Sequence, residues 1–411
     1  MRVVVNGLAA LKPKTGVGHH VANLAAALAA EFPDDTFDLY PGERVADLAR
    51  RFARPPAPPS AGAPRPRPIK AWATSMAKSV ARWASRVHFG AYSYSGRFDL
   101  YHEPNFIPFP SRLPTVVTVH DLSVLRFPEW HPADRVKMHT QHFIDGIQRA
   151  AHVITVSETV RNEMIDEMNL PPSRVTTVYN GVSRAFRPLP ESDVAAVKAG
   201  LGLPDRYFLC VGTIEPRKNL GTAMRAFADL PSAVRAACPL VLAGPWGWQA
   251  EAEREFFHTT GRAAGVRHVG YVADADLPAV YCGATGLVYP SHYEGFGLPL
   301  VEMLACGGAV LASTAAAVRE VCGPCAAFIN PDDVQGWRDA MMRLATDNDY
   351  RSALSSSGGA ARARSFTWER AARETVDVYK KVLQPPPRPA QSQVAVLGVT
   401  PRSSGSRNPA A

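Results

Sequence analysis

Short runs of apolar, β-branched residues recur along the chain, and most of them lead through a polar or glycine-bearing turn into a segment with helical periodicity. Such runs occupy residues 2–5, 116–119, 152–156, 175–178, 207–211, 239–245, 286–289 and 308–313. Continuous apolar runs are typical of strands that are buried on both faces, so the alternation predicts parallel sheets covered by helices. With 411 residues the chain is long enough for two such units. We therefore expect an α/β fold with two doubly wound, Rossmann-like domains that face a central cleft.

The most specific pattern lies in residues 288–307, VYPSHYEGFGLPLVEMLACG. A buried-type strand leads into a glycine-bearing loop, and Pro299 then opens a predicted helix. Glu294 in the loop and Glu302 in the helix have seven residues between them, so both carboxylates can face one cleft at the end of a strand. Carboxylates accept hydrogen bonds from the paired hydroxyls of a sugar or a ribose. The alternative interpretation is a helix-capping glutamate and an unrelated surface glutamate.

The same loop offers backbone donors for an anion. At the start of a helix the first N–H groups are unpaired, and the helix dipole adds positive charge there. The amides expected to hold phosphate oxygens are those of Phe296, Gly297 and Leu298.

The segment EGFGLPLVE resembles the E-x7-E motif of the family 4 retaining glycosyltransferases, which have the GT-B fold. The resemblance covers about residues 1–383 and is densest in the second half. It implies that Glu294 orients the sugar of a nucleotide diphosphate sugar and that Glu302 binds the ribose. It also implies a front-face mechanism without a covalent nucleophile.

A second site motif is GTIEPRKN, residues 212–219, between a predicted strand and a helix from about residue 220. Arg217 and Lys218 stand just before that helix, so their charges and the helix dipole converge on one anion site. A solvated basic turn is the alternative. In the family, the matching lysine clamps the donor diphosphate. Relatives often carry an arginine directly after the glycine, whereas this chain has Thr213, so Arg217 is expected to supply the second charge.

The first half contributes a strand-end histidine. His120 follows the buried run of residues 116–119, although a lone histidine is more often structural. The segment TVHDL resembles the family segment whose histidine contacts the donor sugar, which implies that role for His120. Gly16 and Gly18 form a predicted loop between the first strand and a helix from His19, and the resemblance places this loop over the donor or the acceptor.

Two further groups of contacts are expected, and one pair of aspartates is not expected to bind a metal. Glu103 and Asn105, in the segment HEPN, end another strand and are expected to line the acceptor side. Tyr271 and Val272 match the segment near which relatives hold the nucleotide base. Asp274 and Asp276 have the spacing of a metal motif but lie on that base side, where relatives bind no metal.

The net positive charge of the chain indicates anionic partners. The net charge is +8 and the isoelectric point about 9.2, which favours nucleotide-sugar phosphates, lipid phosphates or an anionic membrane surface. No nucleic acid is expected as a partner. Residues 48–98 contain no acidic residue, and residues 69–89 have the pattern of a basic amphipathic helix. Its apolar side would carry Trp72, Met76 and Trp83. This helix is predicted either to lie on the inner face of the cytoplasmic membrane or to pack on the first domain.

The cysteine pattern does not predict a disulfide framework, because six cysteines are scattered through the chain. Cys322 and Cys325 have thioredoxin-type spacing, but we expect them in a loop before a strand, which argues against a redox role. No apolar run is long enough to span a bilayer, and the N-terminal segment has the pattern of a strand rather than of a signal peptide. The chain is therefore expected to act in the cytoplasm.

These patterns predict an N-terminal, acceptor-side domain in residues 1–187 and a C-terminal, nucleotide-sugar domain in residues 188–365. A terminal helix, residues 366–383, would cross back to the first domain, and residues 384–411 are expected to be disordered. The resemblance to EPRKN-bearing mannosyltransferases implies a metal-independent transfer of hexose, with GDP-mannose as first candidate donor and no other cofactor. The acceptor would be a hydroxyl of a glycan or a lipid-linked glycan in cell-surface polysaccharide biosynthesis.

Two alternatives remain at this stage. Another GT-B enzyme, such as a nucleotide-sugar epimerase or a sugar phosphorylase, would have the same fold, although a phosphorylase needs a pyridoxal-binding lysine site that the sequence lacks. A non-catalytic sugar- or lipid-binding protein would also keep the fold.

Overall fold

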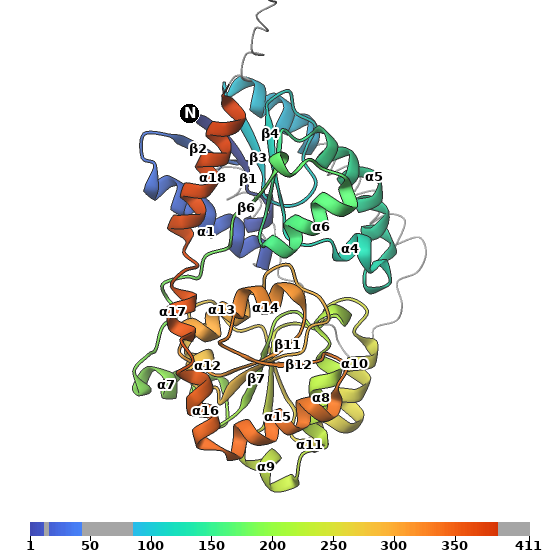
Figure 1. Cartoon of the computed structure of the whole chain (residues 1–411), viewed down its shortest axis with the longest axis vertical. Coiled ribbons are helices and arrows are strands. Elements are labelled where there is room, and N and C mark those ends of the chain that lie inside the picture. Colours follow the sequence, from blue (N-terminus) through green and yellow to red (C-terminus); the bar gives the residue numbers. More distant parts are fainter. Residues whose placement is uncertain (12–15, 43–84, 385–411) are drawn as a thin grey trace, which may run out of the picture.

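The computed structural model describes residues 1–11, 16–42 and 85–384. It has two lobes, each built on a parallel sheet covered by helices on both faces (Figure 1). The predicted helix of residues 69–89 and the predicted disorder after residue 384 fall largely outside the described residues. Within residues 85–95, which are helical, Phe89 is buried and Val87 is exposed.

The first lobe is organised around a six-stranded sheet in the order β2-β1-β3-β4-β5-β6, in which every neighbouring pair is parallel. The strands are β1 (Arg2–Asn6), β2 (Thr36–Tyr40), β3 (Leu100–Glu103), β4 (Thr115–Val119), β5 (His152–Thr155) and β6 (Val175–Thr177). The α-helices that the structure bounds in this lobe are α1 (Gly16–Glu31), α4 (Ser123–Arg126), α5 (Ala133–Arg149) and α6 (Glu158–Met168). Ser157 caps α6, because its side chain accepts a hydrogen bond from the Val160 N–H.

The second lobe has a sheet of the same size, also with all neighbouring strands parallel, in the order β12-β11-β10-β7-β8-β9. The strands are β7 (Phe208–Val211), β8 (Leu240–Ala243), β9 (Arg267–Gly270), β10 (Gly286–Tyr289), β11 (Val310–Ser313) and β12 (Ala327–Ile329). The helices are α7 (Glu191–Leu201), α8 (Leu220–Ala228), α9 (Ser232–Ala237), α10 (Glu251–Phe256), α11 (Arg262–Ala264), α12 (Leu277–Cys282), α13 (Leu298–Ala305), α14 (Ala316–Cys322), α15 (Val334–Thr346), α16 (Asn348–Ser355) and α17 (Gly359–Ala363).

Each sheet is covered on both faces because alternate strand residues point to opposite sides. In the second lobe, Leu209 and Leu287 pack with α12, α13 and α14, whereas Phe208 and Val288 pack with α8 and α15. All of these strand side chains are buried, which explains why their sequences are continuously apolar.

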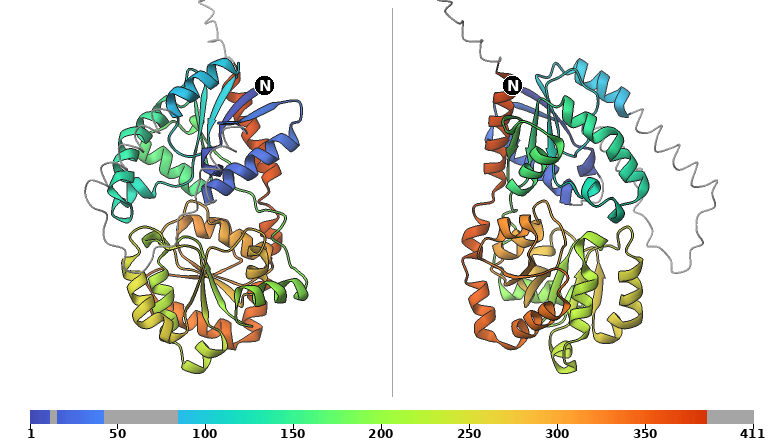
Figure 2. Two further views of the ribbon diagram at one scale, coloured as in Figure 1. Left: turned by 180° about the vertical axis from the view of Figure 1, so that it is seen from behind. Right: turned by 45° about the vertical axis from the view of Figure 1, so that its right-hand side comes forward.

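The last helix, α18 (Trp368–Leu383), packs on the first lobe although it follows the second in sequence. It lies beside α1, as all three views show (Figures 1 and 2). The Tyr379 hydroxyl lies 2.6 Å from Nδ1 of the buried His102. Gly181 in the linker contacts the start of α18 so closely that a Cβ there would lie 2.2 Å from the Trp368 nitrogen. The crossing therefore depends on a glycine in the linker.

Two sequence-based boundaries need correction. Gly16 and Gly18 lie in the first turn of α1, not in a loop before it, because the helix begins three residues earlier than its apolar spacing indicates. Cys322 is the last residue of α14, whereas the sequence placed it in a loop. Within the described residues, no helix combines the length and the apolar character needed to cross a bilayer.

Candidate active site

The loop between β10 and α13 is shaped by two glycines. Gly297 has φ of 97°, in the left-handed region that favours glycine. Gly295 meets the other lobe: a Cβ at this position would lie 1.6 Å from the carbonyl oxygen of His120. The sequence between Glu294 and Glu302 is therefore glycine-rich because the backbone must both turn sharply and touch the opposite domain.

Four charged side chains gather where β7 and β10 end. Arg217 Nη1 donates to Glu294 Oε2 at 2.6 Å, and Lys218 Nζ donates to Glu294 Oε1 at 2.6 Å. Arg217 Nη2 also donates to Glu215 Oε1 at 2.9 Å. Lys218 Nζ donates to the Tyr289 hydroxyl at 3.0 Å. The two sequence motifs thus form one buried ion cluster in which a single carboxylate bridges both cations.

Glu294 and Arg217 keep their charges at neutral pH. Burial alone would raise the pKa of Glu294, but the charges of Arg217 and Lys218 outweigh burial and lower this pKa to about 2. The pKa of Arg217 is well above its usual value, because Glu294 and Glu215 outweigh the burial that lowers it. The pKa of Lys218 is lowered, mainly by burial. Glu294 is therefore a permanent acceptor of hydrogen bonds, not a proton donor.

Glu302 has a different environment although it belongs to the same motif. Its Oε2 accepts a hydrogen bond from the Tyr281 hydroxyl at 2.7 Å. Burial raises its pKa to about 7, and the Tyr281 hydrogen bond only partly offsets this effect. The two glutamates of the motif therefore differ in protonation: one is held ionised by cations, and the other titrates near neutral pH.

His120 lies on the facing wall, directly after β4. Its Nε2 lies 2.8 Å from the Pro104 carbonyl oxygen, and its ring meets the ring of His20 edge-on with 4.7 Å between centroids. Burial lowers the pKa of both histidines. His20 Nδ1 lies 2.7 Å from Asn180 Oδ1, while its buried Nε2 has no hydrogen-bond partner. His20, which the sequence left without a role, is therefore oriented by the linker beside His120.

Asp121 and His131 were also not predicted as site residues. Asp121 Oδ1 accepts hydrogen bonds from the backbone and hydroxyl of Ser123 at 2.9 and 2.6 Å. Burial raises the pKa of Asp121, but the charge of Arg217 from the other lobe outweighs it, and the net shift is downward. Neither ring nitrogen of the buried His131 has a hydrogen-bond partner, and burial lowers its pKa to about 4. The only sequence signal for Asp121 as a site residue was that it directly follows His120.

The expected acceptor-side residues lie at the end of β3. Glu103 is buried, and its oxygens accept hydrogen bonds from Asn6 Nδ2, the Tyr101 hydroxyl and the Asn105 N–H at 2.6, 2.6 and 2.9 Å. Burial raises the pKa of Glu103 to about 8. Asn105 is exposed. Glu103 therefore fixes the local loop, and Asn105 is the member of the pair that solvent reaches.

The remaining predicted donor contacts lie around the same cleft. At the start of α1, His19 Nε2 is 3.6 Å from Asp274 Oδ1 of the other lobe, which brings the turn with Gly16 and Gly18 up to the base-side segment. Tyr271 is 57% exposed and donates to Asp274, whereas the side chain of Val272 is buried in the core. Thr213 and Leu298 are partly buried, and Phe296 is buried.

Contacts across the cleft hold the lobes together. The Tyr293 hydroxyl accepts from the Leu122 N–H at 3.0 Å and donates to Glu163 at 2.5 Å. At another point Trp248 Nε1 donates to the Trp130 carbonyl oxygen at 2.9 Å. The site therefore lies where the ends of two parallel sheets meet, and there cations can bind an anion and carboxylates can bind hydroxyls.

Two family models match the chain: Glycosyltransferase Family 4 over residues 14–186 and Glycosyl transferases group 1 over residues 194–360. The O-antigen chain mannosyltransferase B of Escherichia coli is 35% identical over 283 residues, which span 68% of this chain and 74% of that protein. The serotype-specific mannosyltransferase WbdA of Escherichia coli is 30% identical over 276 residues, 66% of this chain but only 34% of that protein. The crystal structure of Anabaena HepE in complex with UDP-glucose has the same fold, with a TM-score of 0.65, 18% identity, and coverage of 92% of this chain and 99% of that one.

Proposed function

Because the chain belongs to the family 4, group 1 glycosyltransferases, which have the GT-B fold, we propose that it is a retaining hexosyltransferase that uses a nucleotide diphosphate sugar. The family membership confirms the resemblance of the EGFGLPLVE segment and the fold expected from it. GDP-mannose is our first candidate donor, because both E. coli relatives are named mannosyltransferases. A hydroxyl of a glycan or lipid-linked glycan in cell-surface polysaccharide synthesis is our candidate acceptor.

The observation that carries this proposal is the ion cluster of Arg217, Lys218 and Glu294. Negative charge grows on the diphosphate as the bond to the sugar breaks, and buried, fixed cations stabilise such charge strongly. Arg217 and Lys218 lie in the turn after β7, with side chains 14% and 12% exposed, and ion pairs with Glu294 at 2.6 Å fix the position of both. These cations supply charge that a divalent metal supplies in other transferases, so we propose metal-independent transfer.

The other residues take roles that fit their environments. Glu294 remains ionised and would accept hydrogen bonds from sugar hydroxyls. Glu302, whose other contact is the Tyr281 hydroxyl, would accept hydrogen bonds from the ribose. His120 faces the cluster from the first lobe and would contact the far side of the sugar. His20 Nε2 and the ring nitrogens of His131 are buried without partners, which is costly unless a polar ligand satisfies them.

Donor binding is tested by thermal shift with GDP-mannose, UDP-glucose and the free diphosphates. A ligand that binds only the folded protein raises the melting temperature by mass action. The double variant Arg217→Ala/Lys218→Ala should lose the shift, while the unliganded variant should still unfold cooperatively. Transfer is followed by detecting the released nucleoside diphosphate with an added glycan acceptor. Donor binding with neither transfer nor hydrolysis in any acceptor pool would favour a non-catalytic binding protein, and a nucleotide sugar altered without release would favour an epimerase.

A further inference from the structure

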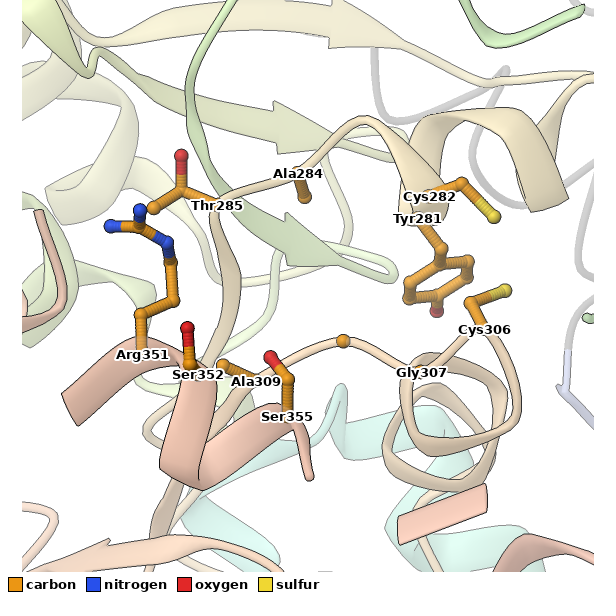
Figure 3. A pocket seen from close by; sticks show the side chains of 11 residues that line it. Tyr281, Cys282, Ala284, Thr285, Cys306, Gly307, Ala309, Arg351, Ser352 and Ser355 are labelled. Atoms are coloured by element: carbon orange, nitrogen blue, oxygen red, sulfur yellow. The ribbon is translucent and has the colours of Figure 1, made fainter. Parts of the chain in front are cut away.

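Two cysteines far apart in sequence lie side by side at the ends of two helices. Cys282 is the last residue of α12, and Cys306 directly follows α13. The Cys306 thiol donates to the Pro278 carbonyl oxygen of α12 at 3.9 Å, which holds it against the helix that ends at Cys282. In Figure 3 both sulfur atoms project to the same side of a pocket, next to each other. The Cys282 thiol in turn donates to the Arg187 carbonyl oxygen at 3.3 Å, which connects the pair to the interdomain linker.

The pair is accessible to a small reagent. Both cysteines line a cavity of about 260 Å³, together with Gly307, Arg351 and Ser355. Cys282 is partly exposed and Cys306 is 7% exposed. A peroxide molecule needs little more room than a water molecule, so it fits in this cavity.

The two thiols differ in reactivity. Interaction with the Cys306 thiol lowers the pKa of Cys282 to about 7, against the effect of burial. The same interaction, together with burial, raises the pKa of Cys306. Cys282 is therefore the more easily ionised thiol of the pair, and its thiolate is the nucleophilic form.

The other cysteines do not share these properties. Burial raises the pKa of Cys210 and of Cys322 to about 12, and Cys238 and Cys325 are buried as well. The thioredoxin-like spacing of Cys322 and Cys325 is therefore not the reactive pair.

We propose that Cys282 and Cys306 form an oxidation site that a hydroperoxide closes to a disulfide, and that closing this site weakens donor binding. The Cys282 thiolate attacks the O–O bond of hydrogen peroxide, becomes a sulfenic acid and releases hydroxide, which takes up a proton to form water. The Cys306 thiol then attacks the sulfenic sulfur. The S–S bond forms, the S–O bond breaks, and the second oxygen leaves as water. Two thiols and one peroxide thus give one disulfide and two waters.

The link to donor binding runs through Glu302 and rests on the proposed function. Tyr281, adjacent to Cys282, donates its hydroxyl to the Glu302 carboxyl at 2.7 Å. The Cys306 N–H donates to the Glu302 carbonyl oxygen at 3.0 Å. A covalent S–S bond draws the ends of α12 and α13 closer than two unbonded thiols allow, so it displaces both supports of Glu302. We expect the affinity for the nucleotide sugar to fall about tenfold.

The experiment treats the reduced full-length protein with a small excess of hydrogen peroxide. Unreduced digests are then examined by mass spectrometry for a peptide that joins residues 282 and 306. Cys282→Ser and Cys306→Ser should each remove this peptide. Cys325→Ser is the matched control, because serine can keep the hydrogen bond to the Ser357 carbonyl oxygen, and it should form the cross-link as the parent does. Failure to form the cross-link, or cross-linking of Cys322 with Cys325 instead, would overturn the proposal.

Donor affinity is measured on the same samples when reduced, oxidised and reduced again with dithiothreitol. The expected result is a reversible loss of about tenfold that is absent from Cys306→Ser. A cross-link without any change in affinity would refute control of donor binding. If the cross-link forms but the reduced protein binds no nucleotide sugar, the proposed function fails and the oxidation step stands, so the two failures are distinguishable.

Discussion

Replacement of Glu294 by glutamine tests whether the ion cluster contributes to stability as its geometry indicates. The variant keeps the size of the side chain and removes the charge that bridges Arg217 and Lys218. The fall in the pKa of Glu294 from 4.5 to about 2, at about 1.4 kcal/mol for each pKa unit, corresponds to about 3 kcal/mol of preference for the carboxylate in the folded state. Glu294 is 5% exposed, so solvent screens this interaction little. We expect the variant to be about 3 kcal/mol less stable at pH 7.

The pH dependence gives the sharper test. Because the folded-state pKa is lowered, this stabilisation is fully present above the unfolded pKa of about 4.5 and is lost as pH falls toward 2. At pH 3 the unfolded state is already largely protonated, so about 2 kcal/mol of the advantage should be gone. The wild type should therefore approach the variant as the solution is acidified.

Urea unfolding followed by tryptophan fluorescence measures the effect, with midpoints compared at a common slope for the transition. Glu374→Gln is the matched control, because Glu374 forms a partly exposed helix-surface pair with Arg370 at 2.7 Å, and its loss should cost less than about 0.5 kcal/mol. A Glu294→Gln cost below about 1 kcal/mol at pH 7, or an equal cost at pH 7 and pH 3, would refute the assignment of a strongly stabilised buried carboxylate.

Three further predictions follow from the cleft and the sequence. Gly295→Ala should reduce transfer by at least about a hundredfold, because a Cβ there would lie 1.6 Å from the His120 carbonyl oxygen, while Gly200→Ala, where a Cβ meets no atom within 4 Å, should leave activity unchanged. Steady-state kinetics compares the two, and equal activity would contradict a closed catalytic state. Transfer should survive EDTA and keep the α configuration of the donor in product NMR; activity restored only by added manganese or magnesium would contradict the first part, and an inverted anomer the second. Binding to anionic liposomes should weaken with salt and fall in Lys78→Glu/Arg82→Glu/Arg86→Glu, and a triple variant that floats as the parent does would exclude this membrane role.

The sequence predicts the parallel strands well because burial on both faces requires continuous apolar runs. β2 was not predicted, and its composition explains why. Thr36–Tyr40 is an edge strand, most of whose residues are partly or fully exposed, so it lacks a continuous apolar pattern. The early start of α1 was missed for a related reason, since two glycines in a first turn are typical of a loop.

The candidate site was predictable where its side chains lie in recognisable motifs after a strand. Arg217, Lys218 and Glu294 follow strands in short motifs, and the structure brings them together. Asp121, His20 and His131 could not be predicted, because their place in the site depends on how the two lobes meet. The pair of Cys282 and Cys306 could not be predicted either, because no spacing rule connects these two cysteines. The recognisable spacing belongs to Cys322 and Cys325, which are buried at and just after the end of α14.

The contact between Glu320 of α14 and the first turn of α6 shows how two lobes can pack in one specific orientation and still separate. The first turn of α6 leaves backbone donors without intrahelical partners, and the Ser157 side chain satisfies only that of Val160. Glu320 of α14 accepts from the N–H groups of Glu158 and Thr159 at 2.7 and 2.9 Å and from the Thr159 hydroxyl at 2.6 Å. When the lobes separate, water can replace the carboxylate at these exposed and partly buried donors, so the net cost of breaking the contact is small. The positive end of the α6 dipole favours this carboxylate over a neutral side chain. The contact therefore fixes the orientation of one lobe relative to the other. The proposed function, in which the site admits a nucleotide sugar and releases a product, needs contacts of this kind, which orient the closed state and allow it to open.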